Sequence, residues 1–231
     1  MMQNLIKSLW IGESLSRMEH SCILSWLNAG YEYELYVYDN VQNIPRGVKI
    51  CDGNKIISSN KIFRYNQNPS RGGGSVSGFS NFFRYKLLMG GGIWADTDMF
   101  CVSRMPDNSD ILIKENDTVA SCLLKIPFNV AEYCWNVCCL KDPMKLKWGE
   151  TGPKLVKEAV TVFSLNNKVK ESAMYLPIMY SDIHKFLDNI PIPECYVLHF
   201  WHEIWRRKNL DKSFIYDQNT LYERLINYTK R

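Results

Sequence analysis

Two spacings of apolar residues alternate near the start of the chain. Residues 5–11 are mostly apolar and are followed by Gly12, a pattern typical of a buried strand that ends in a loop. Over residues 17–29 the apolar positions recur at helical spacing, and Gly30 favours the end of a helix there. A second strand is predicted over residues 33–38. Strand, helix and strand in this order predict an α/β domain, in which helices connect parallel strands.

The later elements follow from the same patterns. A helix is predicted over residues 77–89, and residues 93–95 form a short apolar strand that leads directly into Asp96-Thr97-Asp98. Residues 69–78 are rich in glycine and are expected to form a mobile loop, because the Gly-Lys-Ser/Thr ending of a phosphate-binding loop is missing. Beyond the triplet we predict strands at residues 111–113, 118–124 and 196–199, and helices at residues 128–140, 153–163 and 220–228.

The length and composition indicate one folded domain. The chain has 231 residues, of which 46% are hydrophobic and 23% are charged, the usual balance of a globular protein. We therefore predict a single domain over residues 1–231, with residues 199–231 as a helical C-terminal appendage on the acceptor side. The net charge of +4 is too small to indicate a nucleic-acid-binding protein.

A local basic cluster near the C-terminus has two interpretations. Arg206, Arg207, Lys208 and Lys212 either face anionic lipid head groups or an acidic acceptor, or they form an ordinary solvated helix face. The first ten residues have too short an apolar run for a signal peptide or a membrane span. We therefore expect a cytoplasmic protein, in which the basic cluster is the candidate for peripheral contact with the inner face of the membrane. The eight cysteines lack metal-binding spacing and are expected to be reduced and mostly buried.

The Asp96-Thr97-Asp98 triplet is the main candidate for chemistry. Two aspartates one residue apart, directly after an apolar strand, aim their carboxylates at one small volume if the chain turns at the second. Mg²⁺ or Mn²⁺ in proteins is commonly held by one or two carboxylates, with water and phosphate oxygens in the remaining positions. Such an ion neutralises the charge that develops on a leaving diphosphate. An Asp-x-Asp triplet is also common in surface turns, so the residues around it decide whether it indicates a metal site.

The context is a longer motif. Residues 79–98, FSNFFRYKLLMGGGIWADTD, resemble the donor-site signature of the Asp-x-Asp glycosyltransferases of family 32 and the sugar-transferring region of related bacterial toxins. The family form is roughly F-S-D-x-x-R-Y-x-x-L-x-x-x-G-G-x-Y/W-x-D-x-D. Other landmarks in the family order are Trp10-Ile11-Gly12, Gly30, Thr151-Gly152-Pro153 and His199-Phe200-Trp201. The resemblance covers residues 9–205 and implies a GT-A fold, a single Rossmann-like nucleotide-sugar-binding domain with a mixed sheet.

The resemblance also implies roles for individual residues. Asp98 would be the principal metal ligand, Asp96 would bind the metal or the ribose, and His199 would be a third metal or diphosphate contact. Arg84 would reach the donor sugar or its diphosphate, because a guanidinium group suits such oxygens. Asp96, Asp98 and Arg84 form the predicted catalytic set. Asn81 stands where the family has aspartate, so the preference for the transferred sugar stays open.

The donor-binding residues implied by the resemblance extend to both ends of the chain. Trp10 would stack on the base, and the indole N–H of Trp201 would donate to the leaving phosphate. The segment 199–205 would close over the donor as a lid, with His202 and Glu203 as further polar candidates. For Trp10, Arg84, His199 and Trp201 the alternative is a purely structural role. The predicted donor-binding set is Trp10, Ile11, Gly12, Ser80, Asn81, Arg84, Asp96, Thr97 and Trp201.

The function implied by this resemblance is sugar transfer. We expect a metal-dependent retaining glycosyltransferase that moves a hexose or N-acetylhexosamine from a nucleotide-diphosphate sugar, with UDP-sugars favoured and Mn²⁺ or Mg²⁺ as cofactor. The expected acceptor is an oligosaccharide or lipid-linked glycan of surface polysaccharide biosynthesis. Modification of a protein and a non-catalytic sugar-nucleotide-binding module are the alternatives. A haloacid-dehalogenase-like phosphatase fits poorly, because its Asp-x-Asp motif lies near the N-terminus and normally continues with Thr or Val.

Overall fold

A five-stranded mixed sheet forms the centre of the computed structural model, which describes residues 4–68, 72–107 and 110–229. Its order is β3-β2-β1-β4-β8, and the first four of these strands are parallel while β8 is antiparallel to β4. The α/β prediction is confirmed at this level. The strands are β1 (Leu5–Leu9), β2 (Glu32–Val37), β3 (Lys49–Asp52), β4 (Ile93–Ala95) and β8 (Leu123–Leu124).

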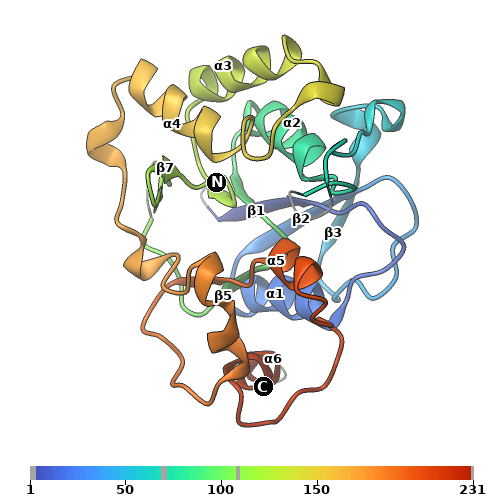
Figure 1. Cartoon of the computed structure of the whole chain (residues 1–231), viewed down its shortest axis with the longest axis vertical. Helices are drawn as coiled ribbons and strands as arrows, with labels where there is room; N and C mark the ends of the chain where they lie inside the picture. Colours follow the sequence, from blue (N-terminus) through green and yellow to red (C-terminus); the bar gives the residue numbers. More distant parts are fainter. Residues whose placement is uncertain (1–3, 69–71, 108–109, 230–231) are drawn as a thin grey trace.

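Helices cover both faces of this sheet (Figure 1). In Figure 1, α2 (Ser77–Leu88), α3 (Phe128–Cys139) and α4 (Pro153–Val162) lie above the sheet, and α1 (Arg17–Asn28) lies below it. Side chains alternate across β1, so that Leu9 packs in the core with α2 and α3, while Ile6 packs in the core with α1. This two-sided burial explains why β1 is mostly apolar.

The boundaries of α1 follow from local chemistry. The backbone N–H of Met18 donates to the Ser16 hydroxyl, and the Glu19 carboxylate accepts from the Ser16 backbone N–H, which together form a capping box. The helix ends before Gly30, which has a φ of 80°. The predicted helix over residues 17–29 is therefore confirmed to within one residue.

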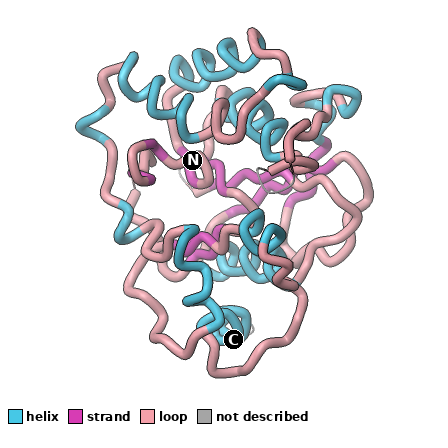
Figure 2. The backbone as a smooth tube through the Cα atoms, in the orientation of Figure 1, coloured by secondary structure: helices cyan, strands magenta, loops and turns pink. Residues whose placement is uncertain are grey.

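A second group of elements lies below and beside the main sheet in Figure 1. Strand β5 (Met99–Cys101) pairs antiparallel with β9 (Val197–His199), and β6 (Lys114–Glu115) pairs with β7 (Thr118–Val119) as a short hairpin. Helices α5 (His202–Arg207) and α6 (Leu221–Tyr228) belong to the C-terminal segment, where long loops connect the helices in Figure 2.

The C-terminal segment packs on α1. Phe200, Trp205 and Tyr222 share a buried cluster with Met18 and Cys22 of α1. Two ion pairs reinforce this contact. Arg17 binds both carboxylate oxygens of Glu223 at 2.9 and 2.8 Å, and Lys212 lies 2.5 Å from an oxygen of the fully buried Glu19. The cluster and the ion pairs fix the segment between α5 and α6 to the start of α1.

Some sequence predictions differ from the structure. Residues 111–113 do not form a strand, because Ile111 bridges Lys125 and Ile113 bridges Lys170 as isolated pairs. The strand predicted over residues 118–124 is two separate strands, β7 and β8, in different sheets. Strands β3 and β5 were not predicted. The expected glycine-rich loop lies partly outside the described residues, at positions 69–71.

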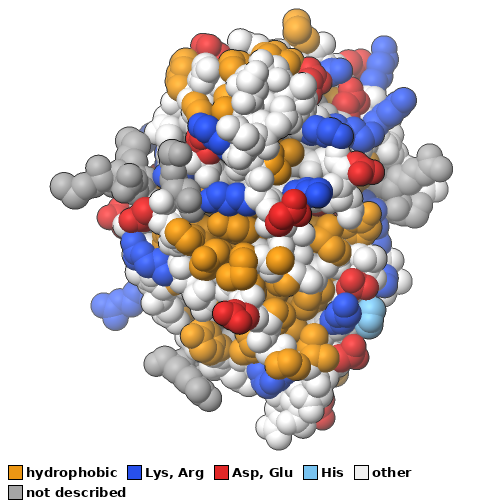
Figure 3. Space-filling model, turned by 90° about the vertical axis from the view of Figure 1, so that its left-hand side faces the viewer, with side chains coloured by type: hydrophobic (Ala, Val, Ile, Leu, Met, Phe, Trp, Pro, Cys, Tyr) orange, Lys and Arg blue, Asp and Glu red, His pale blue; other side chains and the backbone are white. Residues whose placement is uncertain are grey.

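The basic cluster is largely neutralised within the protein. Arg206 and Arg207 both form ion pairs with Glu203 on the same helix, and Lys212 pairs with Glu19. On the face shown in Figure 3, acidic and basic side chains are mixed around an apolar area. The ion pairs with Glu203 and Glu19 favour the interpretation that the basic cluster is an ordinary solvated surface, and they speak against a patch that binds anionic lipid.

The thiols and the helix lengths complete the description. The eight cysteines are all free, and six of them are buried, as expected. Within the described ranges, none of the helices combines the length and the apolar character needed to cross a membrane.

Candidate metal and donor site

The chain turns sharply at the Asp96-Thr97-Asp98 triplet. Asp96 follows β4, where its backbone N–H donates to the carbonyl of Cys122 next to β8, at 2.7 Å. The N–H of Met99 then donates back to the carbonyl of Asp96 at 3.0 Å, and β5 leaves the main sheet to pair with β9. The turn required by the sequence argument is present, and it lies at the carboxyl end of a parallel strand, where ligands of α/β sheets usually bind.

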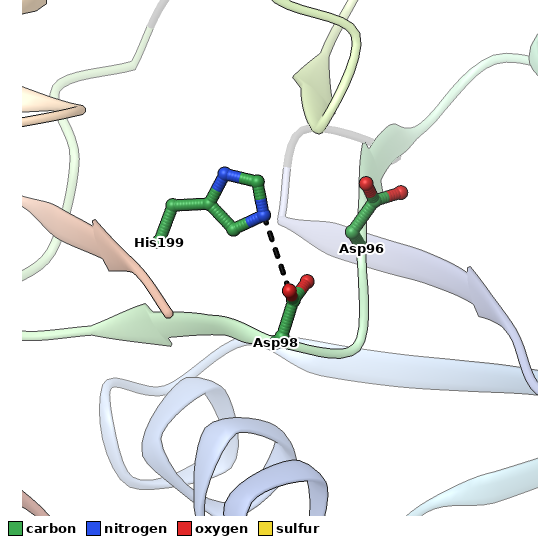
Figure 4. A group of neighbouring side chains, drawn as sticks. All are labelled: Asp96, Asp98 and His199. Carbon is green, nitrogen blue, oxygen red and sulfur yellow. Dashed lines mark ion pairs between the residues drawn. The ribbon is translucent and has the colours of Figure 1, made fainter. Parts of the chain in front are cut away.

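A histidine from the far end of the sequence joins the two aspartates. His199 is directly opposite Met99 in the β5–β9 pair, and its Nε2 lies 3.2 Å from Oδ2 of Asp98. One ligand atom from each of Asp96, Asp98 and His199 lies within 4.8 Å of the others. Figure 4 shows the two aspartates on the turn and the imidazole approaching from β9.

The donor atoms fit a divalent cation. Oδ1 of Asp96 and Oδ2 of Asp98 accept the hydrogen bonds of these carboxylates, which leaves one oxygen of each without a partner among the described residues. Two carboxylate oxygens and an imidazole nitrogen would occupy part of a coordination shell and leave positions for water or phosphate oxygens. The set suits Mn²⁺ at least as well as Mg²⁺, because Mg²⁺ prefers oxygen ligands alone.

Burial and charge set the protonation of this group. Burial alone would raise the pKa of Asp98, but the His199 imidazole and the backbone N–H of His202 hold that pKa well below its usual range. Burial raises the pKa of Asp96, and the Arg84 guanidinium opposes this rise. Burial disfavours the charged form of His199, yet the Asp98 carboxylate raises the pKa of His199 above its usual value. A divalent cation bound here would supply the positive charge that the protonated His199 imidazole otherwise provides beside Asp98.

Arg84 lies behind Asp96 and is only 2% exposed. One terminal nitrogen donates to Oδ1 of Asp96 at 2.7 Å, the other donates to Oδ1 of Asn81 at 2.9 Å, and the guanidinium lies 4.8 Å from the centre of the Trp94 ring. Its buried Nε has no hydrogen-bond partner in the described structure. The guanidinium therefore holds the Asp96 carboxylate in place, and its terminal nitrogens are already bonded inside the protein.

Asn81 connects this group to the loop before α4. Its amide nitrogen donates to the Thr151 hydroxyl at 3.3 Å, while its oxygen accepts from Arg84. A Cβ on Gly152 would approach the Asn81 amide to 3.2 Å, so a larger residue at that position would require the Asn81 side chain to shift by a few tenths of an ångström. Asparagine at position 81 thus keeps the acceptor that Arg84 needs and adds a donor for Thr151.

The predicted base-binding segment lies at the end of β1. The backbone N–H of Trp10 donates to the carbonyl of Tyr36 on β2 at 2.9 Å, and the ammonium of Lys212 lies 5.2 Å from the centre of the Trp10 ring. Trp10 and Ile11 line the cleft, whereas Gly12 is not among the residues that line it. Gly12 has a φ of 156°, and a Cβ there would lie 3.2 Å from the Trp10 indole nitrogen. Gly12 therefore allows the tight turn after β1 that brings the backbone close to the Trp10 ring, and it does not itself line the cleft.

The indole of Trp201 is bonded within the protein. Its indole N–H donates to the carbonyl of Ile178 at 2.8 Å, so in this conformation it is not available to a phosphate. Trp201 has a φ of 59°, an uncommon conformation for a bulky residue, and its ring centre lies 3.9 Å from that of His199. The ring thus packs against the third candidate metal ligand.

These contacts predict a structural effect of Trp201→Phe. We expect the variant to lose about 1 kcal/mol in free energy of unfolding, because the Ile178 carbonyl loses its donor while the ring contact is kept. Urea unfolding followed by circular dichroism measures this. If stability is unchanged while turnover falls more than donor affinity, the indole N–H serves the leaving phosphate instead.

One cleft of about 740 Å³ contains the predicted site. It is lined by Ser80, Asn81, Arg84, Thr97 and the three candidate metal ligands, and also by His202 and Glu203. The sequence reasoning missed several lining residues that belong to no motif; they are Tyr65, Glu115, Asn116, Asp117, Trp148, Lys154 and Tyr180. Arg207, which the sequence analysis placed in the basic cluster, also lines the cleft. Neither protein-family models nor the sequences of curated proteins show a match to this chain.

Proposed function

We propose that the protein is a metal-dependent glycosyltransferase of the GT-A type that uses a nucleotide-diphosphate sugar. The observation that supports this best is the cluster of Asp96, Asp98 and His199, whose ligand atoms lie within 4.8 Å of one another in a cleft of about 740 Å³. A cleft of this size is in the range of small-molecule and cofactor sites. Asp96 and Asp98 lie inside the motif that resembles family 32, and His199 belongs to a separate landmark of that resemblance, so geometry and sequence favour the same chemistry.

Asp98, Asp96 and His199 would hold Mn²⁺ or Mg²⁺. The ion supplies positive charge to the diphosphate, whose leaving oxygen gains negative charge as the sugar departs. Arg84 orients Asp96 through its bond of 2.7 Å, and the N–H of His202 orients Asp98 through a bond of 2.8 Å. The two carboxylates are therefore held in place by the protein and would offer a fixed geometry to the ion and the donor.

The donor would extend across the cleft from Trp10. Trp10 and Ile11 would contact the base, with UDP favoured, and Thr97, between the two aspartates, would face the ribose and diphosphate. Ser80 and Asn81 would face the transferred hexose or N-acetylhexosamine. The residues of α5 that line the cleft, His202, Glu203, Ile204 and Arg207, would cover the donor. Transfer with retention, to an oligosaccharide or lipid-linked glycan of surface polysaccharide biosynthesis, is the activity that the family resemblance suggests.

A non-catalytic nucleotide-sugar-binding module is the second candidate. The observation that favours it is that two groups predicted to contact the diphosphate are hydrogen-bonded within the protein. The Trp201 indole is bonded to Ile178, and the terminal nitrogens of Arg84 are bonded to Asn81 and Asp96. Such a module would bind the donor with metal but would not break the bond to the sugar.

Donor hydrolysis tests both candidates. The purified protein is incubated with a panel of UDP- and GDP-sugars, and release of the nucleoside diphosphate is measured with Mn²⁺, with Mg²⁺ and with EDTA. We expect release with either ion and none with EDTA, because the ion supplies the charge that the leaving diphosphate needs. Metal-dependent donor binding without release would indicate the module. Release that is unaffected by EDTA would contradict the metal site.

A further inference from the structure

Part of the cleft is not used by the proposed donor and metal contacts. Tyr180, Glu115 and Asn116 line the same cleft but come from the β6–β7 hairpin and from the segment before β9. In Figure 1, β7 lies at the left of the molecule, whereas β2 and β3 lie towards the right. The backbone N–H of Trp10 is bonded to β2, through the carbonyl of Tyr36. A molecule that contacts Tyr180 would therefore approach the metal cluster from the side away from the base.

Tyr180 presents an aromatic surface to this part of the cleft. The side chain is 42% exposed, although it is fixed on two sides. Its ring is 5.6 Å from that of Trp201 in an edge arrangement with an angle of 79°, and its hydroxyl accepts from the amide nitrogen of Asn116 at 3.3 Å. An exposed aromatic ring whose orientation is fixed in this way is suited to stacking against a ligand.

Glu115 adds an acceptor next to this ring. Its carboxylate is half-buried and has no hydrogen-bond partner among the described residues, while its backbone carbonyl accepts from the Thr118 hydroxyl. Burial raises the pKa of Glu115, and His199, Asp96 and Arg84 are close enough to influence that pKa. Glu115 is therefore a polar group near the metal cluster that the protein itself does not satisfy.

We propose that Tyr180, Glu115 and Asn116 form the acceptor subsite and bind a pyranose ring. This inference rests on the proposed glycosyltransferase function. A pyranose has an apolar C–H face, which suits the Tyr180 ring, and hydroxyl groups along its edge, which suit a carboxylate and an amide. Glu115 accepts a hydrogen bond from one acceptor hydroxyl and holds it towards the metal cluster. Because the polar groups of this subsite are a carboxylate and an amide, the acceptor unit is a neutral sugar and carries no phosphate or carboxylate there.

Comparison of transfer with hydrolysis tests this subsite. The probes are methyl α- and β-glucopyranoside, galactopyranoside and mannopyranoside, supplied with the UDP- or GDP-sugar that the protein hydrolyses. Water is the acceptor in hydrolysis, so Tyr180→Ala and Glu115→Gln are expected to leave hydrolysis within about twofold of wild type while each lowers kcat/KM for the pyranoside about tenfold. Tyr180→Phe should retain most of the transfer.

Matched controls lie outside the cleft. Tyr228→Ala removes a tyrosine that is 49% exposed on α6, and Glu171→Gln removes the exposed carboxylate that pairs with Lys114. Neither control is expected to change transfer. Thermal unfolding of all variants checks that Tyr180→Ala and Glu115→Gln remain folded at the assay temperature.

The outcomes separate the two proposals. Absence of hydrolysis by the wild-type protein overturns the glycosyltransferase function. Hydrolysis without transfer to any of the pyranosides, and without their binding in saturation-transfer NMR in the presence of UDP and Mg²⁺, overturns the acceptor subsite alone. The subsite is also overturned if folded Tyr180→Ala and Glu115→Gln transfer as well as wild type, or if they lose hydrolysis and transfer equally.

Discussion

Asp98→Asn is expected to lower metal-dependent donor hydrolysis by about a thousandfold, which corresponds to about 4 kcal/mol of transition-state stabilisation. Asp98 is the aspartate that lies beside the third candidate ligand, because its Oδ2 is 3.2 Å from His199 and also accepts from the His202 N–H at 2.8 Å. Asparagine keeps the shape and can still accept from His202, but it removes the negative charge that holds the cation. The loss should therefore be in metal affinity and turnover, with the fold retained.

Hydrolysis rates and calorimetric titration with Mn²⁺ measure these two effects. Asp182→Asn is the matched control, since Asp182 is a surface aspartate whose only recorded ion pair in the described structure is with Lys185 at 3.6 Å. It should bind Mn²⁺ and hydrolyse the donor like wild type. If Asp98→Asn binds Mn²⁺ with unchanged affinity and keeps its rate, the metal site is elsewhere.

The parts of the fold that the sequence predicted are those with a local signal. The helix α1 has its capping residues next to it in sequence, and β4 runs directly into the aspartates, so both follow from short segments. Strand β3 lacks such a signal. It is an edge strand with mostly exposed residues, and without a buried face it has no apolar pattern to reveal it.

The candidate site also combines residues that a short segment predicts with residues whose positions depend on distant contacts. The proximity of Asp96 and Asp98 follows from their spacing, but the position of His199 depends on the pairing of β5 with β9, which are almost a hundred residues apart. Only the family resemblance indicated His199. Tyr180 contacts Asn116 and Trp201, which are distant in sequence, whereas Glu115 lies in the short local hairpin β6–β7. No motif includes either residue. The resemblance assigned Arg84 to the donor, but the sequence did not show that Arg84 is buried beside Asp96, because this tertiary contact is not visible in the helical pattern.

Arg84→Ala is expected to lower the free energy of unfolding by about 3 kcal/mol, because it leaves the partly buried Asp96 carboxylate without its cationic partner. The Trp94 indole would still donate to Oδ1 of Asp96 at 2.7 Å, so the carboxylate keeps one neutral donor. Arg84→Lys should cost less, because the charge remains. A lysine cannot bind Asp96 and Asn81 with the fixed fork of a guanidinium, so some stability and some order at Asp96 are still lost.

Urea unfolding with and without Mg²⁺ and UDP distinguishes this role from a donor contact. Since a bound cation would supply positive charge to Asp96, the ligands should narrow the stability difference between wild type and Arg84→Ala, provided that the variant still binds them. Arg104→Lys is the matched control, because Arg104 also stacks on an aromatic ring, at 5.2 Å from Tyr31, but is exposed and bonds only to carbonyls. If Arg84→Lys and Arg84→Ala are as stable as wild type and only the affinity for the nucleotide sugar falls, Arg84 acts on the donor directly. Its side chain would then have to exchange Asp96 or Asn81 for the diphosphate when the donor binds.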